Sequence, residues 1–147
     1  MPCIITISVI ITISKGEPMA LKYSRQREAI KEYVMTRCDH PTADEVYMSV
    51  RQEFPNISLG TVYRNLTLLS DMGELVRLRV GDGVDRFDAA THPHYHFICQ
   101  ECGSVEDLQI PIMDHINETA SEGFHGQILS HSAQFYGRCT NCLKTNS

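Results

Sequence analysis

Hydrophobic residues in the first half of the chain recur at helical spacing in three successive segments. The first segment begins at Ser24, the second at the capping box Thr42-Ala43-Asp44-Glu45, and the third is capped by Ser58 and ends near Gly73. Their apolar faces are formed by Ala29, Ile30, Tyr33 and Val34, by Val46, Tyr47 and Val50, and by Val62, Leu66 and Leu69. The pattern predicts three short helices.

The pattern changes to strict alternation after the third helix. Val76, Leu78 and Val80 alternate with two arginines, which is typical of a strand, and the turn Gly81-Asp82-Gly83 then leads the chain back. Three short helices followed by a basic hairpin predict an N-terminal winged helix-turn-helix domain over residues 19–84, whose third helix can enter the major groove of DNA.

Several residues of this domain are candidates for DNA contact. Tyr63 and Arg64 lie on the outward face of the third helix, where they can reach bases or phosphates, whereas Arg77 and Arg79 can meet the neighbouring backbone. The candidate set is Arg25, Ser58, Thr61, Tyr63, Arg64, Arg77 and Arg79. The alternative is an amphipathic helix whose polar face meets only water.

The second half combines strands with a helix. We expect strands near residues 94–98 and 104–109, a helix near 112–120 and strand structure over 124–136. The expected fold class is therefore α+β. A hinge over residues 85–91 is expected to join the first domain to a C-terminal α/β domain over residues 92–147.

Four of the six cysteines form two Cys-x2-Cys pairs, Cys99 with Cys102 and Cys139 with Cys142. Two such pairs supply a complete tetrahedral thiolate set for Zn²⁺, and a site closed by four thiolates is structural. The alternatives are two disulfides in a secreted protein or a thioredoxin-like redox pair. Both are disfavoured because we find no export signal and neither pair opens a helix. Cys38 is expected to be a buried thiol at a helix end.

A second group of candidate ligands lies between the two halves. His94 and His96 alternate along a strand, so both imidazoles share one face and can bind one ion. Asp88 lies just before them. Asp107 lies on the strand returning from the first cysteine pair, and the hairpin register decides whether it joins them. The alternative is a set of solvated or hydrogen-bonded side chains without a metal.

The net charge of −5 is unevenly distributed. Residues 86–147 hold three basic and seven acidic residues, whereas residues 20–85 hold nine basic and ten acidic ones. The near-neutral first half keeps most of the arginines and is compatible with DNA binding.

The first 18 residues differ from the rest. Their apolar, β-branched run from Ile4 to Ile13 is too short to span a bilayer and lacks signal-peptide features. We interpret residues 1–18 as an extension that is disordered or precedes the native start, with a membrane or partner tether as the alternative.

Several motifs occur together with an order and spacing that coincidence does not explain. They are Ser24-Arg25-Gln26-Arg27, His40-Pro41-Thr42-Ala43, Thr61-Val62-Tyr63-Arg64-Asn65-Leu66, Arg86-Phe87-Asp88, His94-Tyr95-His96-Phe97-Ile98-Cys99, Cys102-Gly103, and Tyr136-Gly137 ahead of Cys139 and Cys142. Over residues 20–145 the sequence resembles the ferric uptake regulator (Fur) family.

The resemblance implies a regulatory site formed by His40, Asp88, His94, His96 and Asp107, and a homodimer formed through the C-terminal domain. The implied regulatory ion is Fe²⁺ or Mn²⁺, beside the structural Zn²⁺. An ion that gains His40 only when the domains close favours a closed dimer whose recognition helices fit double-stranded operator DNA. The resemblance therefore implies a cytoplasmic, metal-dependent transcriptional repressor.

Asp107 indicates one branch of the family. An aspartate there, together with Asp88, resembles the peroxide-responsive repressor (PerR) branch, whereas iron-uptake regulators usually carry glutamate at that position. This branch implies that hydrogen peroxide reacts with bound Fe²⁺, that His40 or His94 is oxidised, and that DNA is released. Mn²⁺ would preserve repression. The reaction is stoichiometric, so we do not expect an enzyme.

The rival within the family is an iron- or zinc-uptake regulator, which differs in the metal that drives DNA binding and in its response to peroxide. Pro93 and Tyr95 stand where an additional metal site of many iron-uptake members needs ligands, so His131 is expected to be structural.

Two rivals come from other classes. A zinc-dependent hydrolase could use the two strand histidines, but the sequence offers no matching general base. Rubredoxin-like electron transfer through the four cysteines would leave the first half unexplained. We expect no membrane partner and no small-molecule substrate other than peroxide as the signal.

Overall fold

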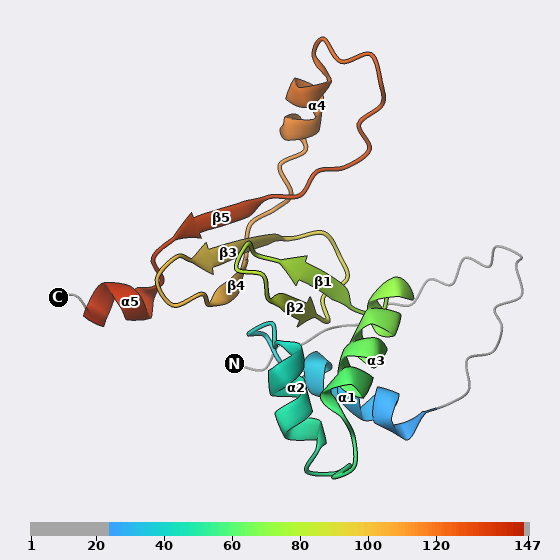
Figure 1. Cartoon of the computed structure of the whole chain (residues 1–147). Coiled ribbons are helices and arrows are strands. Elements are labelled where there is room, and N and C mark those ends of the chain that lie inside the picture. The colour runs from blue at the N-terminus through green and yellow to red at the C-terminus, as the bar shows by residue number, and fades with distance from the viewer. Residues whose placement is uncertain (1–23, 146–147) are drawn as a thin grey trace, which may run out of the picture. The chain divides into compact units, whose positions relative to one another are not determined.

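The computed structural model describes residues 24–145, which form two compact units (Figure 1). The first unit consists of residues 24–37 and Pro41–Thr91, and the second consists of Cys38–His40 and residues 92–145. The predicted extension, residues 1–18, lies outside the described residues. The domain limits expected from the sequence stay predictions.

The described part of the first unit contains three helices and a two-stranded antiparallel sheet. In chain order these are α1 (Arg25–Met35), α2 (Ala43–Val50), α3 (Leu59–Asp71), β1 (Val76–Arg79) and β2 (Asp85–Asp88). Ser24, Thr42 and Ser58 each accept a hydrogen bond from the backbone N–H three residues later, which begins the three helices. The three predicted helices and their start signals are confirmed.

The core of the first unit joins the three helices to the hairpin. Its most buried members are Ile30, Val34, Val46, Val62, Leu66, Leu69, Leu75 and Phe87. Burying an aliphatic or aromatic side chain of this size contributes about 1.5–3 kcal/mol. The inward face of α3 is therefore held by packing, which leaves its polar face for other contacts.

The second unit contains a three-stranded sheet in the order β4-β3-β5. Its elements are β3 (Tyr95–Cys99), β4 (Val105–Leu108), α4 (His115–Ser121), β5 (Gln134–Gly137) and α5 (Thr140–Thr145). The central strand β3 pairs antiparallel with β4 and parallel with β5. Four of its five residues are buried, as a strand covered by neighbours on both sides requires.

Two expectations for the second unit were wrong, and one helix was missed. Strand structure was expected over 124–136, but β5 covers only Gln134–Gly137. The preceding segment begins after Gly123, whose φ of +74° breaks an extended run, and it includes Leu129 with 79% of its surface exposed. The helix α5 was not predicted, and Cys38 is exposed and not buried. Among the described residues, no helix has the length and apolar character needed to cross a membrane.

Candidate metal centres and nucleic-acid interface

The two cysteine pairs lie together in the second unit. Sγ of Cys99 lies 3.8 Å from Sγ of Cys142, and Sγ of Cys102 lies 3.7 Å from Sγ of Cys139. Tetrahedral zinc with bonds of about 2.3 Å to sulfur requires sulfur–sulfur distances of about 3.8 Å, whereas a disulfide requires about 2.05 Å. The four cysteines are free thiols whose spacing fits a zinc ion.

Strand pairing and tight turns bring the two pairs to one end of the sheet. Cys99, at the end of β3, lies opposite Gly137 at the end of the parallel strand β5. The N–H of Gly103 donates to the carbonyl of Cys99 at 2.9 Å, and Gly103 has a φ of +72° that favours glycine. The N–H of Leu143 donates to the carbonyl of Cys139 at 3.0 Å as α5 begins.

Hydrogen bonds set the ionisation of these thiols. The pKa of Cys99 is lowered to about 6, first because the backbone N–H of Cys102 donates to its sulfur and next because that of Cys139 does. The pKa of Cys139 is lowered mainly by the N–H of Cys142. The pKa of Cys142 is raised by its side-chain contacts with Cys139 and Cys102. Four thiolates this close repel one another, so a divalent cation is needed to ionise all of them.

Three imidazoles and one carboxylate converge elsewhere in the second unit. Oδ1 of Asp107 lies 2.8 Å from Nε2 of His40, 3.1 Å from Nε2 of His94 and 3.5 Å from Nε2 of His96. Around an ion bound at about 2.1 Å, neighbouring ligand atoms lie about 3.0 Å apart in octahedral and about 3.4 Å apart in tetrahedral geometry. The spacing fits a divalent transition-metal ion, for which imidazole and carboxylate are suitable ligands.

Backbone carbonyls orient two of these rings. Nδ1 of His40 lies 3.3 Å from the carbonyl of Val105, and Nδ1 of His94 lies 2.8 Å from the carbonyl of His92. When Nδ1–H donates to a carbonyl, Nε2 keeps its lone pair for a metal. His40 is only 2% exposed and has a φ of +53°, a strained conformation for a residue other than glycine. The fold thus holds the His40 ring in place against backbone strain.

The pairing of β3 with β4 settles the position of Asp107. His96 and Asp107 are directly opposite one another in this antiparallel pair, so their side chains are neighbours on one face. Asp88 is buried at the end of β2 in the first unit, where its Oδ1 accepts a hydrogen bond from the N–H of Ala90 at 2.8 Å. The role of Asp88 as a fifth ligand stays a prediction.

Tyr95, between the two strand histidines, joins a separate hydrogen-bond network. Its hydroxyl accepts from the N–H of Met113 at 2.9 Å and bonds with Nε2 of His131, whose Nδ1 lies 2.8 Å from Oδ1 of Asn117. Both ring nitrogens of His131 therefore have hydrogen-bond partners, and its structural role stays a prediction. Within residues 24–145, the cysteine group and the histidine–aspartate group are the clusters suited to a metal.

The candidate DNA-contact residues lie in the first unit. Near the start of α3, Oγ of Ser58 lies 2.9 Å from Oγ1 of Thr61, which accepts a hydrogen bond from Arg64 at 3.1 Å. Arg25 begins α1, and its guanidinium lies 3.9 Å from the carboxylate of Glu53. Contact between these residues and DNA stays a prediction.

Sequence reasoning missed Asp85, which contacts three of the candidate DNA-binding residues. Its Oδ2 accepts from the hydroxyl of Tyr63 at 2.6 Å and from Nε of Arg77 at 2.8 Å, and its Oδ1 lies 3.7 Å from Nε of Arg79. Asp85 faces Arg79 in the hairpin register. An acidic residue opposite an arginine in the predicted basic hairpin is the signal that could have identified it.

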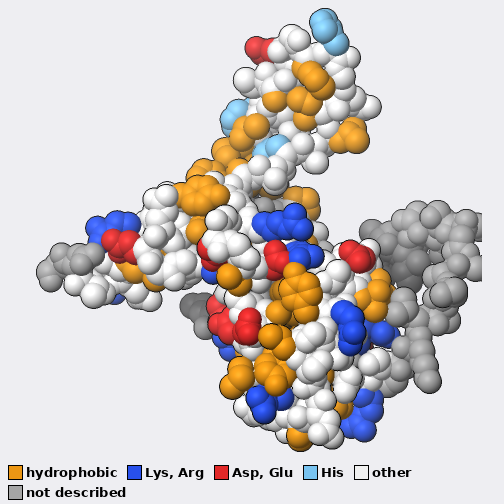
Figure 2. Space-filling model, in the orientation of Figure 1, with side chains coloured by type: hydrophobic (Ala, Val, Ile, Leu, Met, Phe, Trp, Pro, Cys, Tyr) orange, Lys and Arg blue, Asp and Glu red, His pale blue; other side chains and the backbone are white. Residues whose placement is uncertain are grey.

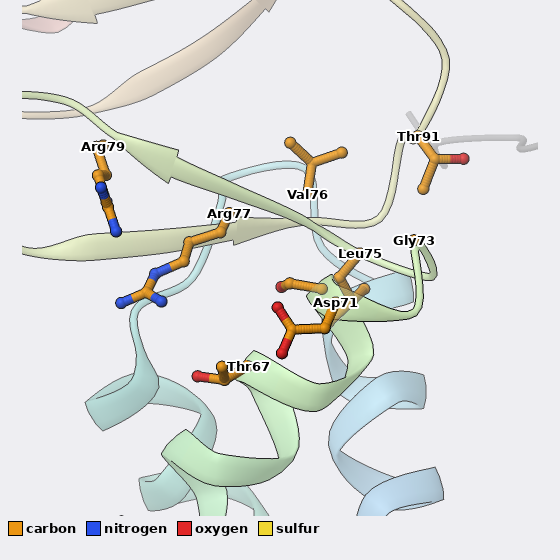
Figure 3. A pocket seen from close by; sticks show the side chains of 9 residues that line it. Thr67, Asp71, Gly73, Leu75, Val76, Arg77, Arg79 and Thr91 are labelled. Carbon is orange, nitrogen blue, oxygen red and sulfur yellow. The ribbon is translucent and has the colours of Figure 1, made fainter. Parts of the chain in front are cut away.

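A cavity of about 540 Å³ lies beside this group of residues. Figure 3 shows it between α3, which contributes Thr67 and Asp71, and β1, which contributes Arg77 and Arg79. The hairpin is therefore not packed continuously against the C-terminal half of α3.

Comparisons with known proteins agree with this arrangement. Residues 18–136 match the model of the Ferric uptake regulator family. The chain is 39% identical over 131 residues to the peroxide-responsive repressor PerR of Staphylococcus aureus (strain Mu50 / ATCC 700699), an alignment that covers 89% of this chain and 88% of that protein.

Two solved structures resemble the chain. The ferric uptake regulator Fur of Helicobacter pylori, described as having three functional metal-binding sites, has a TM-score of 0.76 and 26% identity over 86% of this chain and 85% of that chain. The Campylobacter jejuni peroxide stress regulator has a TM-score of 0.67 and 30% identity over 80% of this chain and 88% of that chain. With a family match over most of its length, a four-cysteine cluster and a separate histidine–aspartate cluster, the chain belongs to the ferric uptake regulator family of metal-dependent transcriptional regulators.

Proposed function

We propose that this protein is a transcriptional repressor that binds double-stranded operator DNA as a homodimer and senses hydrogen peroxide through oxidation of a metal-ligand histidine. The observation that carries the proposal is the convergence of His40, His94 and His96 on one oxygen of Asp107. The 39% sequence identity between this chain and a peroxide-responsive repressor supports hydrogen peroxide as the signal.

The two clusters suit different ions. Four thiolates favour Zn²⁺ and leave no open position, so the cysteine site would hold the ends of β3 and β5 together. Imidazole and carboxylate ligands suit Fe²⁺ and Mn²⁺, which such a site binds weakly enough for their supply to set occupancy.

His40 gives the regulatory site a covalent link to the DNA-binding half. It groups with the second unit, yet the next residue, Pro41, belongs to the first, and the chain then enters α2. A His40 side chain held as a ligand restrains the connection between α1 and α2. We propose that this restraint, together with Asp88, favours the arrangement of the dimer that fits DNA.

Peroxide would remove that restraint through the same rings. Fe²⁺ held by these ligands would lend an electron that cleaves the O–O bond of hydrogen peroxide beside the imidazoles, and it would regain that electron when the ring is oxidised. The net change inserts one oxygen atom into a ring C–H bond of His40 or His94 and releases one water. An oxidised ring no longer offers the same lone pair, so the chain loses a ligand and the DNA-binding state is no longer favoured.

Exposed apolar residues support the homodimer. Figure 2 shows hydrophobic side chains on the lobe that carries α4, and Phe124, Leu129 and Tyr136 are 56%, 79% and 54% exposed. Apolar side chains exposed in this number mark interaction surfaces, and a unit of this size buries a marginal core alone. We propose that a second copy of the chain covers them.

The test compares the zinc-loaded protein with added Fe²⁺ and with added Mn²⁺. A duplex selected by the protein from random-sequence DNA serves as the probe, and binding is measured before and after one equivalent of peroxide. Binding should be lost only in the iron sample, and mass spectrometry should find one added oxygen on the peptide containing His40 or His94.

His125→Ala is a matched control, because His125 is exposed and lies outside both clusters. It should bind DNA and lose it to peroxide as the unmodified protein does. Iron-loaded protein that keeps its DNA with both ligand histidines unmodified would instead identify a metal-uptake regulator.

A further inference from the structure

We infer that Asp85 is a positioning residue for DNA recognition, which joins Tyr63 of α3 to Arg77 of the hairpin and presents them to DNA in one fixed arrangement. The inference rests on the proposed function, because it assumes that α3 binds DNA. Asp85 would touch no DNA itself and would act through its neighbours Tyr63 and Arg77.

The contacts form a closed triangle. The hydroxyl of Tyr63 and Nε of Arg77 donate to the same oxygen of Asp85 at 2.6 and 2.8 Å. Nη2 of Arg77 bonds with both Asp85 and Tyr63, and the guanidinium carbon lies 5.3 Å from the centre of the tyrosine ring. Every member of the triangle touches the other two, so none can turn without breaking two contacts.

Burial and charge make these contacts stronger than an ordinary surface ion pair. The side chains of Asp85 and Arg77 are 16% and 27% exposed, so solvent screens them only partly. The pKa of the Asp85 carboxyl is lowered, first by its hydrogen bond with Arg77 and next by that with Tyr63, and the pKa of Tyr63 is raised by the same carboxylate. Asp85 therefore stays an acceptor and Tyr63 a donor at neutral pH.

The triangle compensates for incomplete packing between the hairpin and α3. A cavity separates β1 from the C-terminal half of α3, so side chains do not pack continuously between them (Figure 3). Tyr63 lies in the N-terminal half of α3 and reaches Asp85 on β2. The triangle thus joins helix and hairpin where Tyr63 remains 39% exposed and available to a ligand. Side chains ordered before binding lose less entropy when DNA arrives.

A competing interpretation predicts the opposite effect of Asp85 on DNA affinity. Asp85 could occupy arginines that DNA phosphates would otherwise bind, in which case its removal would strengthen binding. The geometry favours positioning, because Arg77 is engaged by both Asp85 and Tyr63. Arg79 lies farther from Asp85, at 3.7 Å, and 78% of its side chain is exposed.

The test measures DNA affinity of zinc- and Mn²⁺-loaded protein as a function of salt, with a duplex selected by the unmodified protein from random-sequence DNA. Asp85→Asn is compared with Asp82→Asn. Asp82 lies in the same hairpin, 2.9 Å from Arg86, so both variants remove one negative charge next to an arginine. Asp85→Asn should bind about tenfold more weakly than Asp82→Asn, with an unchanged salt slope, because the charge-assisted hydrogen bonds from Tyr63 and Arg77 are weakened and no phosphate contact is lost.

Tyr63→Phe keeps the ring and removes only the hydroxyl, so it tests the link without altering charge. It should weaken binding, and the Tyr63→Phe/Asp85→Asn double variant should lose less affinity than the sum of the two single losses. If Asp85→Asn lowers the unfolding temperature below the assay temperature, Tyr63→Phe alone carries the test, with Asp82→Asn as its control.

Three results would overturn the inference. Tighter binding by Asp85→Asn with a salt slope steeper by about one or two would show competition with phosphates. Equal affinities of Asp85→Asn and Asp82→Asn would show that only overall charge matters. If the unmodified protein selects no duplex, the proposed function fails and the inference fails with it.

Discussion

The two candidate metal centres share one unit but are assembled differently. The cysteine site takes its ligands from two short Cys-x2-Cys segments, whose four sulfur atoms lie within 4.8 Å of one another. The histidine–aspartate site draws on three separate segments, at residue 40, residues 94–96 and residue 107, and on two ligand types. A closed set of identical soft ligands suits a permanent ion, whereas a mixed set from distant segments suits an ion whose binding changes the protein.

The two sites also hold different parts of the molecule together. The cysteine site joins the ends of β3 and β5 within the second unit. The other site includes His40, whose neighbour in the chain belongs to the first unit. Loss of zinc from the cysteine site should therefore unfold the second unit. Loss of the ion from the histidine–aspartate site should change DNA binding and leave the fold intact.

The largest effect is expected when the cysteine site is broken. Cys102→Ser should reduce bound zinc from one ion per chain to none and unfold the second unit, because structural zinc contributes about 10–16 kcal/mol in small zinc domains. Metal analysis and hydrogen exchange of the β3 and β5 amides measure this. Cys38→Ser, at an exposed cysteine outside the cluster, should keep its zinc. A folded, zinc-loaded Cys102→Ser protein would contradict the structural role.

Breaking the other site should leave the fold intact. His40→Ala should weaken Mn²⁺ binding by at least about 100-fold, because even the loss of an outer hydrogen-bond partner weakens metal binding by about 10–100-fold. Titration followed by electron paramagnetic resonance gives the affinity, and zinc content should stay at one ion per chain. Unchanged Mn²⁺ affinity would remove His40 from the site.

Acid should sharpen the contrast. Hydrogen bonds from the backbone N–H groups of Cys102 and Cys139 lower the pKa of Cys99 to about 6 in the folded unit, so protons should not compete with zinc for this sulfur above that pH. The protein should therefore keep its zinc from pH 7.5 down to about 6 and release it as the pH falls further, because metal-bound thiolates must be deprotonated. Metal analysis after dialysis at each pH measures the retained zinc. Release of zinc already above pH 7 would contradict the lowered pKa.

The smallest effect is expected beside the histidines. Tyr95→Phe removes the hydroxyl that bonds with His131 and the N–H of Met113. It should lower the free energy of unfolding by about 1 kcal/mol, because the partly buried N–H of Met113 loses its acceptor. Thermal unfolding of the metal-loaded protein measures it, with Tyr47→Phe in the first unit as the control. A Tyr95→Phe variant as stable as that control would show that the network is dispensable.

Local chemistry explains which elements were predictable. The helix starts at Ser24, Thr42 and Ser58 were readable because a capping side chain and its N–H partner lie three residues apart. The strand predicted over 124–136 failed because extended sequence forms a strand only where a partner is available. Asp85 was missed because Tyr63 comes from α3 and Arg77 from β1, and neither helical nor strand periodicity shows that both donate to one carboxylate.

The sequence by itself determined the ligand types, the two cysteine pairs, the alternation of His94 with His96 and the three capped helices, since each depends on residues close together in the chain. Only the tertiary structure decided that Asp107 stands opposite His96, that His40 joins them, and that Asp85 gathers Tyr63 and Arg77. Strand register and long-range packing depend on many weak contacts summed over the whole fold, so short-range patterns do not specify them.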